Sequence, residues 1–180
     1  PRLARRPSRR GAPHPKHGLL SHVLGLPRVA DMLDAGVVVG LGTDGAPANN
    51  RMSLIDELWA ASLVQKGMRL DPTVLDARTA FAMATREGAR ALSLENELGS
   101  LAAGKAADLV LVDPRTVNMT PVHDAVSALV TSMKTENVHS VMCAGRWVMR
   151  DRRLLVCDEQ EVLAEAQARA ESVAGRAGLR

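Results

Sequence analysis

The chain has 180 residues, of which 46% are hydrophobic and 24% charged, and these proportions exclude wholesale disorder. Aromatic residues make up only 2%, which excludes nucleic-acid binding by base stacking and predicts a core of aliphatic and methionine side chains. The formal net charge of +3 arises from residues 1–17, which carry five Arg and one Lys without an acid, so that the rest of the chain holds 17 basic and 20 acidic residues.

Residues 1–17 are rich in Arg, Pro, Gly, Ala and His and show no apolar period. The sequence opens with Pro1, and its first methionine is Met32. We interpret this basic segment as disordered or as a non-native junction; a nucleic-acid-binding tail and a transit peptide are the alternatives. We expect the folded part not to bind nucleic acid, because aromatic residues for base stacking are scarce. We also expect no membrane partner, because no apolar run approaches the ~18–20 residues needed to cross a bilayer.

The first hundred residues predict alternating helices and strands. Apolar residues recur at helical spacing in residues 24–35, and Gly36 follows as a stop signal. The apolar run Val37 to Leu41 predicts a strand buried on both faces, as in a parallel sheet. After a loop over residues 42–50, Ser53 is placed to cap a helix, and residues 74–94 predict further helix.

The second half predicts a region rich in β-structure. Residues 107–112 form an apolar strand, and residues 123–132 suit a helix. Residues 138–143 and 146–150 flank Ala144-Gly145 and predict a hairpin, and residues 159–174 predict a closing helix.

The cysteines indicate a reducing compartment. Cys143 and Cys157 lie 14 residues apart, with neither a CxxC motif nor a histidine at ligand spacing. We therefore expect unpaired thiols and a cytoplasmic protein.

Asp44 is the candidate catalytic residue. It follows the valine-rich run directly, at the carboxyl end of a predicted buried parallel strand, where α/β proteins gather their functional groups. Gly42 and Gly45 flank it and would let the backbone turn and leave the carboxylate open. A Thr-Asp-Gly sequence after a strand is also typical of a simple turn or cap, and the residues alone leave both interpretations open.

Three segments together resemble the amidohydrolase superfamily, nearest its methylthioadenosine/S-adenosylhomocysteine deaminase and chlorohydrolase branch. They are GVVVGLGTDGAPANN, ATREGARAL and GSLAAGKAADLVLVD, and the resemblance extends from about Leu24 to Asp151. It implies an α/β fold: the C-terminal part of a (β/α)8 metal-dependent hydrolase barrel, followed by part of a composite β-sandwich. We expect barrel structure over residues 18–97, β-domain structure over residues 98–156 and a C-terminal helix over residues 157–180.

The resemblance implies that Asp44 binds the catalytic metal and carries a proton. It also implies one divalent ion, Zn²⁺ or Fe²⁺, and hydrolysis of a C–N bond in a small purine- or triazine-like heterocycle by a metal-activated water. Asn49 and Asn50 are candidate contacts to substrate or to the metal's surroundings; equally, they suit a loop that needs left-handed backbone conformations.

Most of the family's metal site has no counterpart in this sequence. The family's His-X-His pair, its further histidines and its catalytic glutamate are missing, and His14, His17 and His22 lack the family's spacing. His123 and His139 lie in the C-terminal region, where we expect surface or packing roles. A fortuitous metal site at His14 and His17 is the alternative.

Several other charged residues are expected to be structural. We expect Lys105 and Asp108 to lie in a turn and at the entry of a strand. Arg146 and Trp147 are expected in a hairpin with a packed indole. Glu57 is expected to be a solvated charge, a capping charge or a subunit contact.

From these features we expect a C-terminal fragment of an amidohydrolase or deaminase that is inactive alone and belongs to a homo-oligomeric complete protein. A noncatalytic interaction or assembly module derived from the fold is the alternative.

Overall fold

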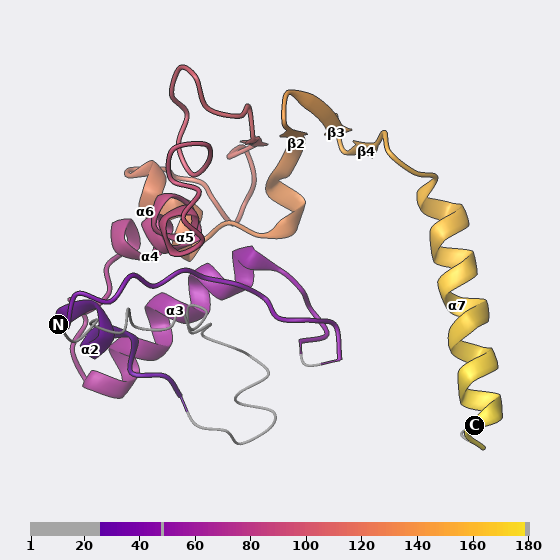
Figure 1. The fold of residues 1–180 in the computed structure, drawn as a ribbon, viewed down its shortest axis with the longest axis horizontal. Helices are drawn as coiled ribbons and strands as arrows, with labels where there is room; N and C mark the ends of the chain where they lie inside the picture. The colour runs from indigo at the N-terminus through magenta and orange to yellow at the C-terminus, as the bar shows by residue number, and fades with distance from the viewer. Residues whose placement is uncertain (1–25, 48, 179–180) are drawn as a thin grey trace, which may run out of the picture. The chain divides into compact units, whose positions relative to one another are not determined.

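The computed structural model describes residues 26–47 and 49–178, and these form two compact units (Figure 1). The first unit contains the described residues up to Lys105 together with Pro114–Asn137, and the second contains Ala106–Asp113 and the residues from Val138 onward. Residues 114–137 therefore belong with the first unit, whereas we had expected residues 98–156 to form one β domain. The basic segment over residues 1–17 lies outside the described residues.

The first unit is built from helices whose starts carry local capping signals. Ser53, Asp76 and Asp124 accept hydrogen bonds from backbone N–H groups at the first turns of α3, α4 and α6. The helices of this unit are α2 (Val29–Asp34), α3 (Leu54–Arg69), α4 (Ala77–Ala84), α5 (Arg86–Ala91) and α6 (Ala125–Thr131), with the short 3₁₀ helix η1 (Thr135–Asn137). The predicted cap at Ser53 is confirmed.

Helix α2 is shorter than predicted, because it begins at Val29 rather than near residue 24. Its start is fixed by Gln65 on α3, which is buried and bonds two backbone groups. The Gln65 side chain accepts from the Ala30 N–H at 3.3 Å and donates to the Pro27 carbonyl at 2.9 Å. The chain leaves the helix through Gly36, whose φ of 74° is the left-handed conformation expected at such a stop.

The predicted strand over residues 37–41 is extended but is not paired as a strand within the described residues. Val39 is fully buried, whereas Val37 is 43% exposed, so the expected burial on both faces is incomplete. Backbone hydrogen bonds hold the segment at both ends, from the Val37 N–H to the Met32 carbonyl at 2.9 Å and from the Leu41 N–H to the Met83 carbonyl at 3.1 Å. Burial of a parallel strand on both faces depends on neighbouring strands.

The predicted helix over residues 74–94 is interrupted at Thr85, which separates α4 from α5. Thr85 has φ of −126° and ψ of −101°, outside the helical region, and its hydroxyl donates to the Phe81 carbonyl at 2.7 Å. The break turns Gly88 towards the extended segment, where a Cβ on Gly40 would stand 3.0 Å from the Gly88 Cα. The lack of a side chain at Gly40 and Gly88 therefore allows the two backbones to approach closely.

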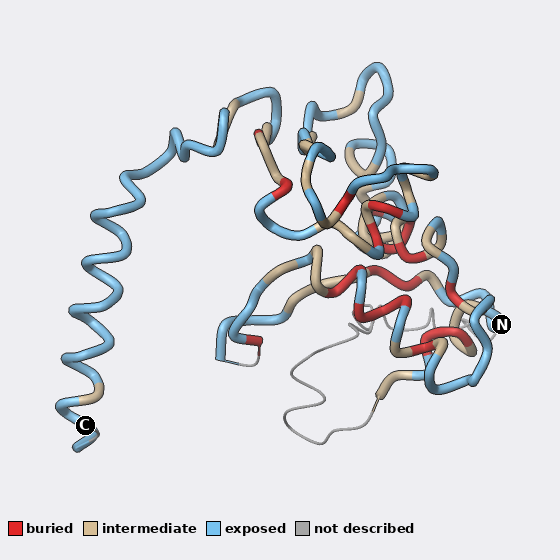
Figure 2. Tube along the Cα trace, turned by 180° about the vertical axis from the view of Figure 1, so that it is seen from behind, coloured by how far each residue is buried: buried red, intermediate tan, exposed pale blue. Residues whose placement is uncertain are grey.

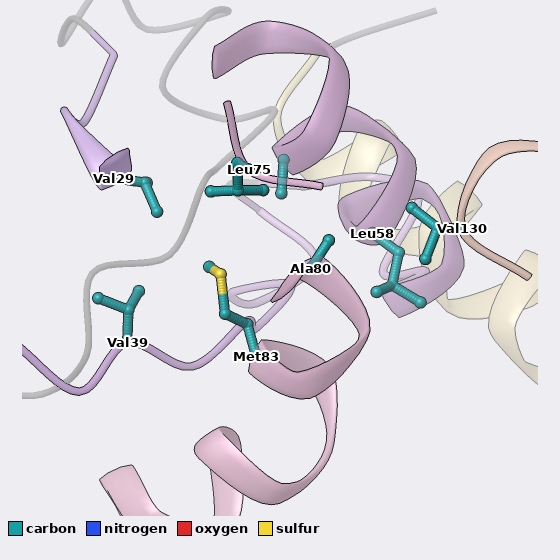
Figure 3. Packing of buried hydrophobic residues seen from close by; sticks show 8 residues of the cluster. Val29, Val39, Leu58, Leu75, Ala80, Met83 and Val130 are labelled. Carbon is teal, nitrogen blue, oxygen red and sulfur yellow. The ribbon is translucent and has the colours of Figure 1, made fainter. Parts of the chain in front are cut away.

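The core of the first unit lies between the extended segment and the helices (Figure 3). Helix α4 packs against α3, α5 and α6, and Figure 2 shows that the buried residues lie mostly in this unit. Phe81 packs against this cluster from a partly buried position. The cluster consists of Val29, Val39, Leu58, Ala61, Leu75, Ala80, Met83 and Val130. These side chains are aliphatic or methionine, as the composition predicts.

The second unit contains a four-stranded antiparallel sheet in the order β1-β2-β3-β4. The strands are β1 (Leu109–Val112), β2 (Val138–Cys143), β3 (Arg146–Arg150) and β4 (Arg153–Leu154). Strands β2 and β3 have the predicted bounds, and Ala144 and Gly145 turn between them with φ of 47° and 77°. The Arg150 guanidinium lies 5.6 Å from the centre of the partly buried Trp147 ring, which supports the predicted packing of the indole.

Helix α7 (Glu159–Arg176) follows the sheet and has no buried residue (Figure 2). Asp158 caps it by accepting from the Gln160 and Glu161 N–H groups. In the described part of the chain, no helix combines the length and apolar character that a membrane crossing requires.

Candidate functional site

Asp44 lies in the loop that follows the extended segment, and its side chain is exposed. It adopts a left-handed backbone conformation with φ of 64°, which is uncommon for a residue other than glycine. One carboxylate oxygen, Oδ1, accepts from the Gly45 N–H at 3.0 Å, and the Thr43 hydroxyl donates to the Asp44 carbonyl at 3.1 Å. The left-handed conformation belongs to Asp44 itself and not to Gly42 or Gly45, the two flanking glycines to which we had assigned the turn.

The structure separates the two asparagines of the loop. Asn49 is 3% exposed, and its carboxamide oxygen accepts from the N–H groups of Arg51 at 3.0 Å and Met52 at 3.3 Å. Asn50 is exposed. The left-handed residue in this stretch is Met52, with φ of 43°, so the expectation that the asparagines supply left-handed conformations is wrong.

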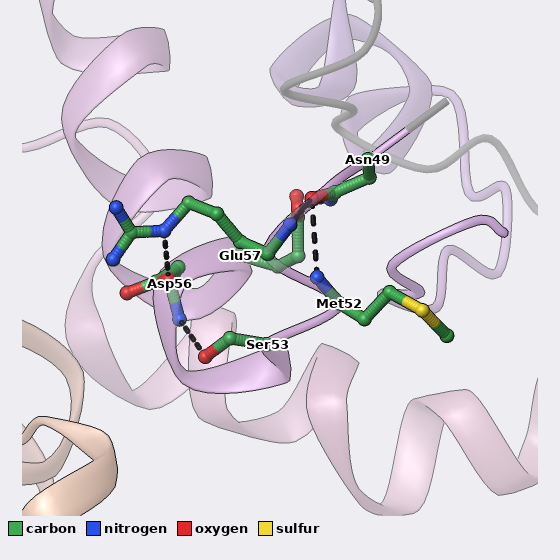
Figure 4. Close-up of polar contacts among 6 residues, drawn as sticks. Asn49, Met52, Ser53, Asp56 and Glu57 are labelled. Carbon is green, nitrogen blue, oxygen red and sulfur yellow. Dashed lines mark hydrogen bonds and ion pairs between the residues drawn. The ribbon is translucent and has the colours of Figure 1, made fainter. Parts of the chain in front are cut away.

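The sequence predicts for Glu57 a solvated charge, a capping charge or a subunit contact. The first of these is wrong, because the side chain is fully buried at 0% exposure. Figure 4 shows it directed towards Asn49, whose Nδ2 donates to Glu57 Oε1 at 2.7 Å. Ala60 and Ala61, three and four residues further along α3, are buried on the same face. That spacing was a signal in the sequence that Glu57 faces inward.

The described residues do not assemble a complete metal site. No group of three or more His, Cys, Asp or Glu side chains that could hold a metal occurs among them. His123 is exposed; His139 lies 3.0 Å from Ser140 Oγ and 3.6 Å from Asp151 Oδ1 in the second unit. Asp44 offers one carboxylate, whereas a zinc site takes three or four protein ligands, so the described residues do not complete such a site. His14, His17 and His22 lie outside them.

A cavity of about 310 Å³ in the first unit does not include the Asp44 loop. Its walls come from Val37 to Val39 and from α2, α4 and α5. Because no residue of the loop over residues 42–50 lines it, this cavity is separate from the candidate catalytic residue.

Lys105 and Asp108 make the structural contacts that we expected. The Lys105 ammonium donates to the carbonyls of Glu95 at 2.5 Å and Leu98 at 3.2 Å. Asp108 Oδ1 accepts from the Ala144 N–H at 2.5 Å and so fixes the hairpin turn between β2 and β3. Both groups are committed to backbone partners rather than to a reacting centre.

Comparison with known proteins gives a consistent match. The model of the amidohydrolase family matches residues 20–148. A 5-methylthioadenosine/S-adenosylhomocysteine deaminase of Acetivibrio thermocellus is 42% identical over 138 residues, which are 77% of this chain and 32% of that protein.

Solved structures show the same relationship. The fold resembles a zinc-bound adenosine deaminase of Xanthomonas campestris with a TM-score of 0.85 and 31% identity, over 89% of this chain and 36% of that one. It also resembles a zinc complex of an atrazine chlorohydrolase from Arthrobacter aurescens, with a TM-score of 0.76 and 29% identity over 85% of this chain and 35% of that one. The chain thus spans about a third of the length of these relatives, and the predicted fold class is confirmed.

Proposed function

This chain belongs to the amidohydrolase family, and from that membership we propose that it supplies the last barrel strand and part of the small β domain of a metal-dependent deaminase. The proposed reaction is hydrolysis of a C–N bond in a purine- or triazine-like heterocycle. The observation that carries the proposal is the exposed carboxylate of Asp44 at the end of the valine-rich segment, inside the region that matches the family. We call the full-length polypeptide that includes this chain and the remaining barrel strands the complete protein.

The proposed cofactor is one divalent ion, Zn²⁺ or Fe²⁺, because zinc is bound in the similar adenosine deaminase and chlorohydrolase structures. Asp44 would supply one oxygen ligand, and histidines outside the described residues would supply the others. When bound, such an ion lowers the pKa of a coordinated water towards ~7 and so supplies a nucleophile near neutral pH.

Asp44 has a second proposed task, which is proton transfer. Its exposed carboxylate accepts a proton from the attacking water and later donates that proton to the departing amine. Asp44 has a left-handed backbone, and its Oδ1 accepts a hydrogen bond from the Gly45 N–H. This bond fixes the plane of the carboxylate and with it the position of the second oxygen, Oδ2. A fixed orientation favours proton transfer because it avoids reorganisation during the reaction.

The experiment compares Asp44→Asn with the wild type in the complete protein. The measurements are zinc content and ammonia release from adenosine, 5′-methylthioadenosine and S-adenosylhomocysteine. We expect kcat to fall about 100-fold or more, because the variant loses the proton carrier and an anionic ligand together. Glu97→Gln, at an exposed position outside residues 42–50, serves as the control and should leave both values unchanged. Normal turnover in Asp44→Asn would refute the assignment.

A noncatalytic assembly module is the second candidate, favoured by the lack of a metal-binding cluster among the described residues. A complete protein that binds no zinc and deaminates none of these nucleosides would support it. Both candidates fit a homo-oligomer in the cytoplasm, a location that suits the two exposed free cysteines, Cys143 and Cys157.

A further inference from the structure

Glu57 is a fully buried acid in the first turn of α3, and this position requires a physical reason. Removing a carboxylate from water is costly unless hydrogen bonds compensate. Asn49 provides such a bond through Nδ2 at 2.7 Å and is itself only 3% exposed. The two side chains thus form a buried polar pair between the loop and the helix (Figure 4).

Asn49 connects this pair to Asp44 through the loop backbone. The Asn49 N–H donates to the Gly45 carbonyl at 2.9 Å, and the Gly45 N–H donates to Asp44 Oδ1 at 3.0 Å. Three hydrogen bonds, joined through the covalent structure of Asn49 and Gly45, therefore connect the buried Glu57 with the candidate catalytic carboxylate.

Capping of α3 does not account for Glu57. The Ser53 side chain already accepts from the Asp56 N–H at 3.3 Å, as an N-cap should. Asp56 lies at the surface side of the same turn and accepts from the Arg51 side chain. Ser53 and Asp56 therefore satisfy the polar groups at the start of α3 without a contribution from Glu57.

We infer that Glu57 is a positioning residue: through Asn49 it holds the loop in the conformation that presents the Asp44 carboxylate. This inference rests on the proposed function of Asp44. Groups that orient a metal ligand by hydrogen bonding, without contacting the metal themselves, typically contribute ~10–100-fold to metal affinity or activity.

The test reverses the polarity of the buried hydrogen bond in the complete protein. Asn49→Asp keeps the oxygen that accepts from Arg51 and Met52 but replaces the donor facing Glu57 with an acceptor. Glu57→Gln alone still offers an oxygen to Asn49. In the double variant, the new amide at position 57 can donate to the new carboxylate at position 49, so the hydrogen bond is restored in the opposite direction.

The readouts are kcat, KM, zinc dissociation constant by chelator competition, and the thermal midpoint of the zinc-free protein. For Asn49→Asp we expect kcat and zinc affinity to fall about 10–100-fold. We expect KM to change by less than about threefold, because the Asn49 side chain is buried and bonded to Glu57, Arg51 and Met52. Glu57→Gln and the double variant should stay within about fivefold of the wild type, since each keeps a donor–acceptor pair. Asp56→Asn, at the adjacent surface position, is the control and should leave kcat and zinc affinity unchanged.

Unchanged kcat and zinc affinity in Asn49→Asp would overturn the inference, even if the thermal midpoint falls, because the pair would then be structural only. Failure of the double variant to recover would overturn it as well. If Asn49→Asp does not fold, Asn49→Ser replaces it: serine keeps a short acceptor but cannot reach Glu57, and the same reduction is expected. If Asp44→Asn itself retains turnover and zinc, the proposed function has failed rather than the positioning role alone.

Discussion

Gly99 lies directly against Ala89: a Cβ on Gly99 would stand 2.8 Å from the Ala89 Cβ and 2.9 Å from the Arg86 Cα. Gly99 also has a φ of 85°, a conformation that residues with a side chain rarely adopt. Arg86 and Ala89 belong to the segment ATREGARAL, which contains α5, and Gly99 begins the segment GSLAAGKAADLVLVD. Their contact explains why the turn carries a glycine at this position.

Gly99→Ala should therefore lower the free energy of unfolding of the complete protein by roughly 3 kcal/mol, from overpacking and backbone strain combined. Gly67→Ala is the matched control, because a Cβ on Gly67 in α3 meets nothing within 4 Å. That substitution should raise stability by up to ~1 kcal/mol, as alanine favours a helix interior. Denaturant unfolding of both variants measures the contrast, and equal effects would contradict the packing argument.

Local turn chemistry explains which elements could be predicted from the sequence. The hairpin of β2 and β3 has the expected bounds because Ala144 and Gly145 adopt the left-handed conformations that a short turn needs. The Ser53 cap was predictable for the same reason, since one side chain satisfies a nearby N–H group.

Features that depend on distant partners were not predictable in this way. The extended segment at Val37 needs neighbouring strands for pairing, and local pattern cannot show whether they are present. Glu57 was misassigned because an acid in the first turn of a helix usually serves the helix dipole, whereas here its partner is Asn49, eight residues away. Asp44 could be located by its place after the valine-rich run, but its left-handed backbone could not.

Two helix caps predict a specific dependence of stability on pH. Hydrogen bonds from the Thr79 backbone and hydroxyl lower the pKa of Asp76 below its ordinary value of 3.8. Hydrogen bonds from the Ser127 backbone and hydroxyl, with a smaller contribution from Arg78, lower the pKa of Asp124 likewise. A lowered pKa in the folded state stabilises the protein above the ordinary pKa, and this stabilisation is lost as pH falls through the lowered value.

The variant that tests this is Asp76→Asn/Asp124→Asn, since asparagine retains an N-cap acceptor without the charge. We expect its thermal midpoint to lie below that of the wild type at neutral pH and the difference to shrink below about pH 4. Glu97→Gln controls for the general loss of an acid at the surface. A difference that grows as the pH falls would have the wrong sign for this explanation.

Substitutions at Lys105 and Asp108 should lower the stability of the protein without lowering its catalytic rate. Lys105→Met removes the donor to the Glu95 and Leu98 carbonyls, and Asp108→Ala removes the acceptor for the Ala144 N–H. Each should cost ~1 kcal/mol in the complete protein, the usual value for a hydrogen bond. Thermal midpoints should fall, while kcat and zinc content stay at wild-type values. A tenfold lower kcat in a variant of unchanged stability would instead assign that residue to the reaction.

The isolated 180-residue chain should release no ammonia from nucleosides and should associate with itself. Its extended segment at residues 37–41 has no strand partner among the described residues, and Val37 is 43% exposed there. An apolar extended segment that lies outside a sheet favours pairing between chains. Val37→Lys should reduce this association, because a charge on such an edge opposes it, whereas Val117→Lys, at a position 99% exposed outside the segment, should not. Sedimentation velocity over a range of concentrations distinguishes the variants. The prediction is wrong if the wild-type chain remains monomeric at every concentration. Equal effects of the two lysines would show that this segment is not the site of association.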